Sequence, residues 1–105
     1  MYVIGGETSW GGPQKTTFKI SLKTQKVSIR AYMHVIRTAM GVCNIGHYIY
    51  AIGGFKELTS CEVYNTLKNR WTMLKYDLPM TKDCATAVPI KKRFIYLFDG
   101  KIPQN

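Results

Sequence analysis

The segment Tyr48–Gly54 reads YIYAIGG, and its pattern returns at Met1–Gly6 (MYVIGG) and at Phe94–Gly100 (FIYLFDG). Aligned on their last glycines, the three segments follow one another at intervals of 48 and 46 residues. Self-similarity at a fixed period of about 50 residues indicates a repeat architecture, in which each unit buries its faces against its neighbours. We assign a structural role to the shared tyrosine of each segment and to the glycines that follow it. These residues are Tyr2, Gly5, Gly6, Tyr50, Gly53, Gly54, Tyr96 and Gly100.

Strand signals dominate the chain. Short segments rich in Val, Ile, Tyr, Phe and Thr alternate with turn residues, and no long stretch keeps a helical period. Residues 31–42 are the most ambiguous, and a short helical turn is the alternative there. Ile49–Ile52 and Phe94–Phe98 are continuously apolar, which predicts that both faces of these strands are buried. The sequence therefore predicts an all-β fold.

The repeat extends beyond the glycines. Ser60–Leu74 (SCEVYNTLKNRWTML) aligns with Thr16–Arg30 (TTFKISLKTQKVSIR). A unit then has four strands: a run of small residues, the tyrosine strand, a third strand that carries Tyr64, and a fourth that begins at Trp71. Large aromatic side chains at these two positions are expected to fill the space between neighbouring units.

This pattern resembles the kelch repeat family, whose units are four-stranded blades of a β-propeller. The resemblance is closest in residues 38–74. The outer units diverge, with Ile20 and Val27 at the two aromatic positions of the first and Asp99 at the first glycine of the third. The residues that carry the resemblance are Tyr50, Gly53, Gly54, Tyr64 and Trp71.

The resemblance implies kelch-type blades, which are four-stranded antiparallel sheets, in an incomplete β-propeller. Residues 1–30 are expected to form an incomplete first blade, residues 38–74 a complete blade, and residues 84–105 the start of a third. These strands amount to about two and a quarter blades, whereas closed propellers have about 4–8. The chain is therefore interpreted as a piece of a longer protein or the product of a truncated reading frame. Open blade edges would allow it to self-associate.

The composition favours a small globular protein with a basic surface. The net charge is +9, and the only tight basic cluster is Lys91-Lys92-Arg93, which is typical of a solvated lysine-rich surface. A protein partner with an acidic surface is the alternative interpretation of this charge, and nucleic acid is disfavoured. No apolar run approaches the ~20 residues that span a membrane. The odd, widely spaced Cys43, Cys61 and Cys84 are typical of reduced thiols, and we expect a cytoplasmic protein without membrane association.

No catalytic motif is visible in the sequence. It lacks the Gly-x-Ser-x-Gly, phosphate-loop, His-Glu-x-x-His and calcium-loop patterns, and His34 and His47 are expected at the surface. We therefore expect no enzyme activity, no catalytic residue, no cofactor and no metal. Some relatives by resemblance are copper oxidases, so an oxidase-type or sugar-modifying propeller remains the less favoured alternative.

The resemblance implies a protein-interaction module. Ligand faces of kelch propellers are made of loops, which directs attention to the long loop Glu7–Lys15 and to the loop after the middle tyrosine strand. Such propellers recruit substrates to cullin ubiquitin ligases through a BTB domain, or bind actin. The chain has no BTB domain, so the adaptor role would belong to a longer parent protein. An inert relic of such a gene is the alternative. The candidate partner-binding residues are Trp10, Arg37, Phe55, Lys56 and Lys82.

Overall fold

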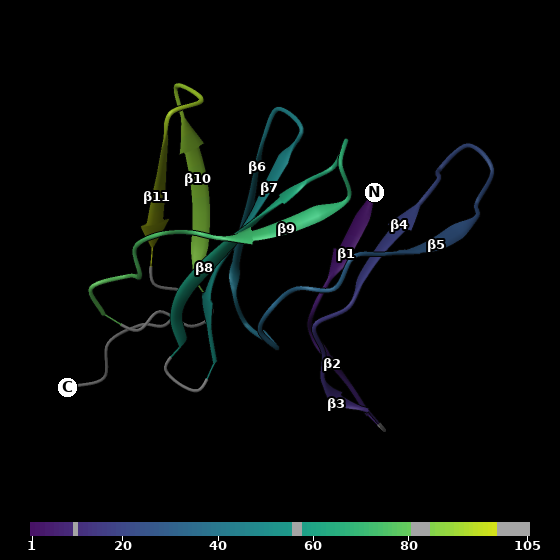
Figure 1. Cartoon of the computed structure of the whole chain (residues 1–105), viewed down its shortest axis with the longest axis horizontal. Coiled ribbons are helices and arrows are strands. Elements are labelled where there is room, and N and C mark those ends of the chain that lie inside the picture. Colours follow the sequence, from purple (N-terminus) through teal and green to yellow (C-terminus); the bar gives the residue numbers. More distant parts are fainter. Residues whose placement is uncertain (10, 56–57, 81–84, 99–105) are drawn as a thin grey trace.

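The computed structural model describes residues 1–9, 11–55, 58–80 and 85–98, and these residues form β-strands and connections without any helix (Figure 1). The all-β fold class is therefore confirmed. The alternative of a helical turn within residues 31–42 is wrong, because residues 31–40 have no regular secondary structure and strand β6 begins at Gly41. Side chains of the middle sheet hold this irregular segment in place, as described below.

The middle of the chain folds into a four-stranded antiparallel sheet with the order β6-β7-β8-β9. Each strand pairs with the next one in sequence through a short connection, as repeat units of this kind predict. The turn after β8 is stabilised by Asn65, whose side-chain oxygen accepts hydrogen bonds from the backbone N–H groups of Leu67 and Lys68. The strands are β6 (Gly41–Ile45), β7 (Tyr48–Gly54), β8 (Leu58–Asn65) and β9 (Arg70–Met73).

Two smaller sheets flank the middle one (Figure 1). The first has three strands in the order β1-β4-β5, and the last is a hairpin of β10 and β11. The long loop that follows β1 contains a further small hairpin, β2–β3, which the sequence did not reveal. The bounds are β1 (Tyr2–Ile4), β2 (Glu7–Thr8), β3 (Gly12–Pro13), β4 (Thr17–Ile20), β5 (Val27–Arg30), β10 (Thr86–Ile90) and β11 (Phe94–Phe98).

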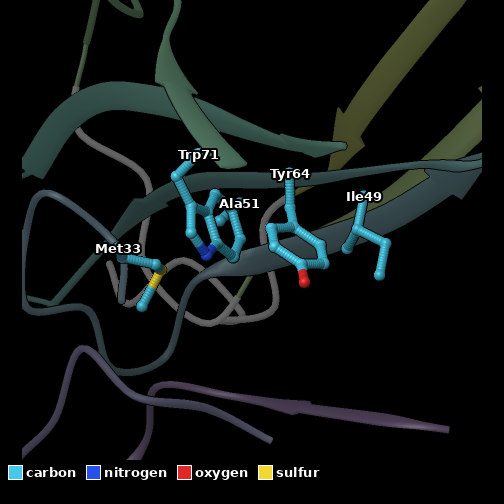
Figure 2. Packing of buried hydrophobic residues seen from close by; sticks show 5 residues of the cluster. All are labelled: Met33, Ile49, Ala51, Tyr64 and Trp71. Atoms are coloured by element: carbon cyan, nitrogen blue, oxygen red, sulfur yellow. The ribbon is translucent and has the colours of Figure 1, made fainter. Parts of the chain in front are cut away.

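The core lies between the first sheet and the middle sheet. Tyr64 and Trp71 project from the same side of the middle sheet towards the first unit (Figure 2). The Trp71 indole donates its N–H to the Thr17 hydroxyl and to the Ala31 carbonyl, each at 3.0 Å. The Tyr64 ring meets the Tyr2 ring edge to face at a centroid distance of 5.6 Å. The two aromatic side chains thus join neighbouring units. Met33, Ile49 and Ala51 complete this buried cluster.

The prediction of strands buried on both faces holds for one segment and fails for the other. Ile49, Ala51 and Ile52 of β7 are all buried, because β7 lies between two other sheets. In β11, by contrast, Phe94, Tyr96 and Phe98 are each more than half exposed. They share one face of the last hairpin, and no described residue covers that face. The prediction for Phe94–Phe98 is therefore wrong, because burial of this face needs a further sheet.

The two described cysteines are buried free thiols. Burial raises the pKa of the Cys43 thiol and of the Cys61 thiol, so both stay protonated at neutral pH. A protonated thiol is a poor nucleophile and a poor metal ligand, and these residues act as small apolar side chains. Cys84 lies outside the described residues.

Candidate protein-interaction site

A buried ion pair organises one end of the middle sheet. The Arg37 guanidinium and the Glu62 carboxylate meet at 3.2 Å, and both side chains are fully inaccessible to solvent. Arg37 also donates to the carbonyl oxygens of Gly53 and Ser60, at 2.9 and 2.6 Å, and to the Ser60 hydroxyl at 2.9 Å. A buried charge is tolerated only when such partners compensate its lost hydration. Arg37 therefore ties β7 to β8 from the inside.

Glu62 holds the irregular segment 31–40 in turn. Its carboxylate accepts hydrogen bonds from the backbone N–H groups of His34 and Val35, at 2.8 and 3.1 Å. If the segment left the sheet, the Glu62 carboxylate would lose these hydrogen-bond donors, which would cost free energy because the carboxylate is buried. The prediction that Arg37 contacts a partner protein is wrong, because its donors are engaged within the chain and its side chain is buried.

The repeat glycines allow segment 31–40 to pass close to both units. A Cβ atom at Gly5 would lie 2.6 Å from the Arg37 carbonyl oxygen, and one at Gly54 would lie 2.9 Å from the Thr38 carbonyl oxygen. Both glycines also have positive φ angles, +59° and +137°, which side-chain-bearing residues rarely adopt. These glycines therefore allow the backbone of segment 31–40 to pass close to Gly5 and Gly54.

A solvent-open cavity lies where this segment meets the connecting loops. Its volume is about 440 Å³. Ile36 and Phe55 are about half exposed beside it, at 49% and 51%. The lining is mostly apolar, with one carboxylate and one hydroxyl, a composition that suits an apolar side chain of a partner. The lining residues are Glu7, Pro13, Ile36, Thr38, Phe55 and Leu58.

Backbone hydrogen bonds hold the walls of this cavity together. The Phe55 N–H donates to the Thr38 carbonyl at 2.8 Å, and the Gly6 N–H donates to the Arg37 carbonyl at 3.0 Å. On the other wall, the Gln14 N–H donates to the Gly6 carbonyl at 2.9 Å and closes the base of the β2–β3 hairpin. Figure 1 shows the β2–β3 hairpin, the end of β7 and the start of β8 towards the lower edge of the picture. Residues of the first unit and of the second unit thus line the same cavity.

The structure places one of the five predicted contact residues at this cavity, namely Phe55. Arg37 lies behind it as an internal support. Trp10, Lys56 and Lys82 lie outside the described residues, as does Gly100 of the repeat set.

Sequence reasoning missed Ile36, Leu58 and Glu62. A usable signal existed for Glu62, because it stands two residues before Tyr64 and therefore points to the same, buried face of its strand.

Within the described ranges, no group of three or more His, Cys, Asp or Glu side chains is placed to hold a metal ion. Residues 1–9, 11–55, 58–80 and 85–98 also contain no helix long and apolar enough to cross a membrane.

Comparison with known proteins gives one family. A family model described as "Kelch motif" matches residues 36–76, a range that begins just before Arg37 and runs through the whole four-stranded sheet. No curated protein matched the chain.

Proposed function

We propose that the chain is a protein-interaction module of the kelch repeat family, because residues 36–76 match a kelch motif. Its contact site would be the cavity beside Phe55, between the loops of the first two units. The single observation that carries this proposal is the pair of half-exposed apolar side chains, Ile36 and Phe55, at a hollow with a fixed backbone. Apolar anchors in such hollows dominate binding energy at protein interfaces.

The test is direct measurement of binding. Peptides selected from a random library on the immobilised chain would be titrated calorimetrically against the wild type and against Phe55→Ala. We expect the substitution to raise Kd by about tenfold or more, because truncation of an interface anchor costs at least ~1.4 kcal/mol.

Leu67→Ala is the matched control, since Leu67 is an exposed apolar residue in the turn at the other end of the middle sheet. A site elsewhere would leave the Kd of Phe55→Ala at the wild-type value. Failure to select any peptide would contradict the proposal as a whole.

The finer role proposed for a longer parent protein is substrate recruitment to a cullin ubiquitin ligase, or actin binding, in the cytoplasm and without catalysis. The net charge of +9 supports a partner with an acidic surface, through long-range attraction. Co-sedimentation with actin filaments, and co-purification of a cullin with the parent protein, separate the two roles. An oxidase-type activity would instead require bound metal, which elemental analysis of the purified chain would detect.

Self-association is a further proposal, supported by the two outer sheet faces. Phe94, Tyr96 and Phe98 are exposed on the last hairpin, and Val3 and Ile29 are exposed together on the first sheet. Contiguous apolar surfaces of this kind favour association. Light scattering after size exclusion would show a discrete oligomer if the faces meet. A non-cooperative, aggregating monomer would support the alternative of an inert relic.

A further inference from the structure

Turns of three sheets lie at the same end of the molecule. Tyr48 pairs with Ile45 on one side and with Asn65 on the other, so the β6–β7 and β8–β9 turns leave the same end of the middle sheet. The Thr66 N–H and hydroxyl both donate to the His47 carbonyl, at 3.0 and 2.8 Å, and so join these two turns. Figure 1 shows the β4–β5, β6–β7 and β10–β11 turns towards the upper edge of the picture, away from the β2–β3 hairpin. These turns, which we call the turn end, comprise residues 21–26, 46–47, 66–70 and 91–93.

The turn end is strongly basic. It holds seven of the 15 Lys and Arg residues of the chain, and it contains no Asp or Glu. All seven side chains are exposed. The one salt bridge in the part of the chain that the structure describes is Arg37–Glu62, so none of these cations is paired with a described carboxylate. They are Lys23, Lys26, Lys68, Arg70, Lys91, Lys92 and Arg93.

The exposed acidic side chains that the structure describes lie away from the turn end. Glu7 is in strand β2, towards the opposite edge of Figure 1. The Asp77 carboxylate accepts a hydrogen bond from the Thr59 hydroxyl at 3.5 Å, near the start of β8, whereas β8 reaches the turn end only at its last residue, Asn65. Positive charge is therefore concentrated at one end of the molecule. The sequence shows only the cluster 91–93, because the other four cations join it through the fold.

Hydrogen bonds fix the backbone of the two longer turns. In the β4–β5 turn, the Gln25 N–H donates to the Ser21 carbonyl at 2.7 Å, and the Ser21 N–H donates to the Lys26 carbonyl at 2.9 Å. In the β8–β9 turn, the Asn69 side-chain oxygen accepts a hydrogen bond from the Tyr64 hydroxyl at 2.7 Å. A fixed backbone loses little conformational freedom when a partner binds. These turns therefore present their cations from set positions.

We propose that the turn end binds an acidic, extended segment of a partner protein. Cations gathered on one surface repel one another and attract a partner of opposite charge. Two observations favour a protein segment over a nucleic acid. Five of the seven cations are lysines, whereas bidentate recognition of phosphate favours arginine. Leu22, which is 75% exposed beside Lys23, offers an apolar contact, and a phosphate backbone binds hydrogen-bond donors instead.

This surface is separate from the cavity beside Phe55. Strand β7 runs from Tyr48, at the turn end, to Gly54, which directly precedes Phe55. The two sites therefore lie at opposite ends of the middle sheet, and they share no residue. The inference goes beyond the interaction site proposed above, and either site could be correct without the other.

The probe is a synthetic twelve-residue peptide of eight glutamates, two leucines and two serines, labelled with a fluorophore and titrated by fluorescence anisotropy. We expect one peptide to bind per chain. Its Kd should rise at least tenfold between roughly 50 and 300 mM NaCl, because salt screens the attraction between exposed charges. A version with glutamine in place of every glutamate should lose binding at least tenfold, because it keeps the length and the leucines but carries no charge.

Two matched double variants locate the site. Lys68→Gln/Lys92→Gln removes one cation from each of two turns and should raise Kd for the acidic peptide at least tenfold. Lys15→Gln/Lys75→Gln lowers the net charge by the same amount, at exposed lysines outside the turn end, and should change Kd less than threefold. Both variants should keep the wild-type melting curve by circular dichroism, since all four side chains are exposed.

The proposal is overturned if the acidic peptide does not bind, or if the two double variants weaken binding equally, since net charge alone would then attract the peptide. A single-stranded oligonucleotide of the same charge is the second probe. If it binds at least tenfold more tightly than the peptide, and loses this affinity in Lys68→Gln/Lys92→Gln, the turn end is a nucleic-acid surface and the proposal is wrong. Phe55→Ala should leave Kd for the acidic peptide unchanged. A loss of binding there, with none in Lys68→Gln/Lys92→Gln, would place the peptide at the cavity and overturn this inference alone.

Discussion

Arg37→Met is expected to destabilise the folded chain by about 3–5 kcal/mol, because it leaves the Glu62 carboxylate buried without its counter-charge. The substitution also leaves the Gly53 and Ser60 carbonyl oxygens without the guanidinium group that donates hydrogen bonds to them. A loss of this size is comparable to the whole stability of many small domains. Urea unfolding followed by circular dichroism measures it.

Arg70→Met is the control, since Arg70 is an exposed arginine on β9 of the same sheet. Its effect should stay within about 0.5 kcal/mol. The double variant Arg37→Met/Glu62→Leu removes both charges, yet it should remain less stable than the wild type, because the His34 and Val35 amides lose their acceptor. Equal stability of Arg37→Met and Arg70→Met would show that the ion pair does not support the fold.

Trp71→Ala is expected to cost about 3–5 kcal/mol through the cavity it leaves between the first two units. The Thr17 hydroxyl and the Ala31 carbonyl would also lose their shared donor. Trp71→Phe keeps most of the volume but removes the indole N–H, and should cost about 1–3 kcal/mol. The same urea titration measures both variants.

Phe94→Ala truncates an aromatic side chain that is 57% exposed on β11, and it serves as the comparison for Trp71→Ala. A small loss of stability there and a large loss at Trp71 would show that packing between the first two units stabilises the fold. It would exclude a general effect of removing any aromatic side chain. Similar losses at both positions would contradict the packing described here.

The sequence was enough to predict the fold of the middle unit, because the residues that determine this fold lie close together in the sequence. The glycines that end β7, the polar turn after Asn65 and the two aromatics of β8 and β9 all lie within the segment they organise. The kelch resemblance rests on these residues. The sheet order confirms the fold class, and a kelch motif model matches residues 36–76.

The site was harder to predict because its interactions are not local. Arginine is usually exposed, and nothing near Arg37 in the sequence marks it as buried. Its partner, Glu62, lies 25 residues away, and the pair forms only once β8 has folded beside β7. Phe55 could be predicted as a loop residue because it follows a glycine pair that ends a strand. The position of Ile36 depends instead on the buried ion pair of its neighbour Arg37 with Glu62.

The last hairpin shows a second limit. Repeat alignment would pair Pro89 with Tyr96, as Cys43 pairs with Tyr50, but the structure pairs Val88 with Tyr96. Proline has no N–H to donate, and this shift by one residue places Pro89 opposite Ile95 instead. The turn gains a residue in return, and Lys91 and Lys92 adopt positive φ angles. A repeat pattern alone does not predict such a change of register.

The bond between Trp71 and Thr17 bears on the order in which the chain folds. It joins residues 54 apart in sequence, whereas the strands of the middle sheet are joined by short turns. Because closing a long loop costs entropy before any contact forms, the middle sheet should assemble first and the first sheet should dock onto it late. Trp71→Phe would then accelerate unfolding and leave the folding rate unchanged; a slowed folding rate would argue for early docking. The contacts that form first during folding would lie within one repeat, and those that form last would lie between repeats.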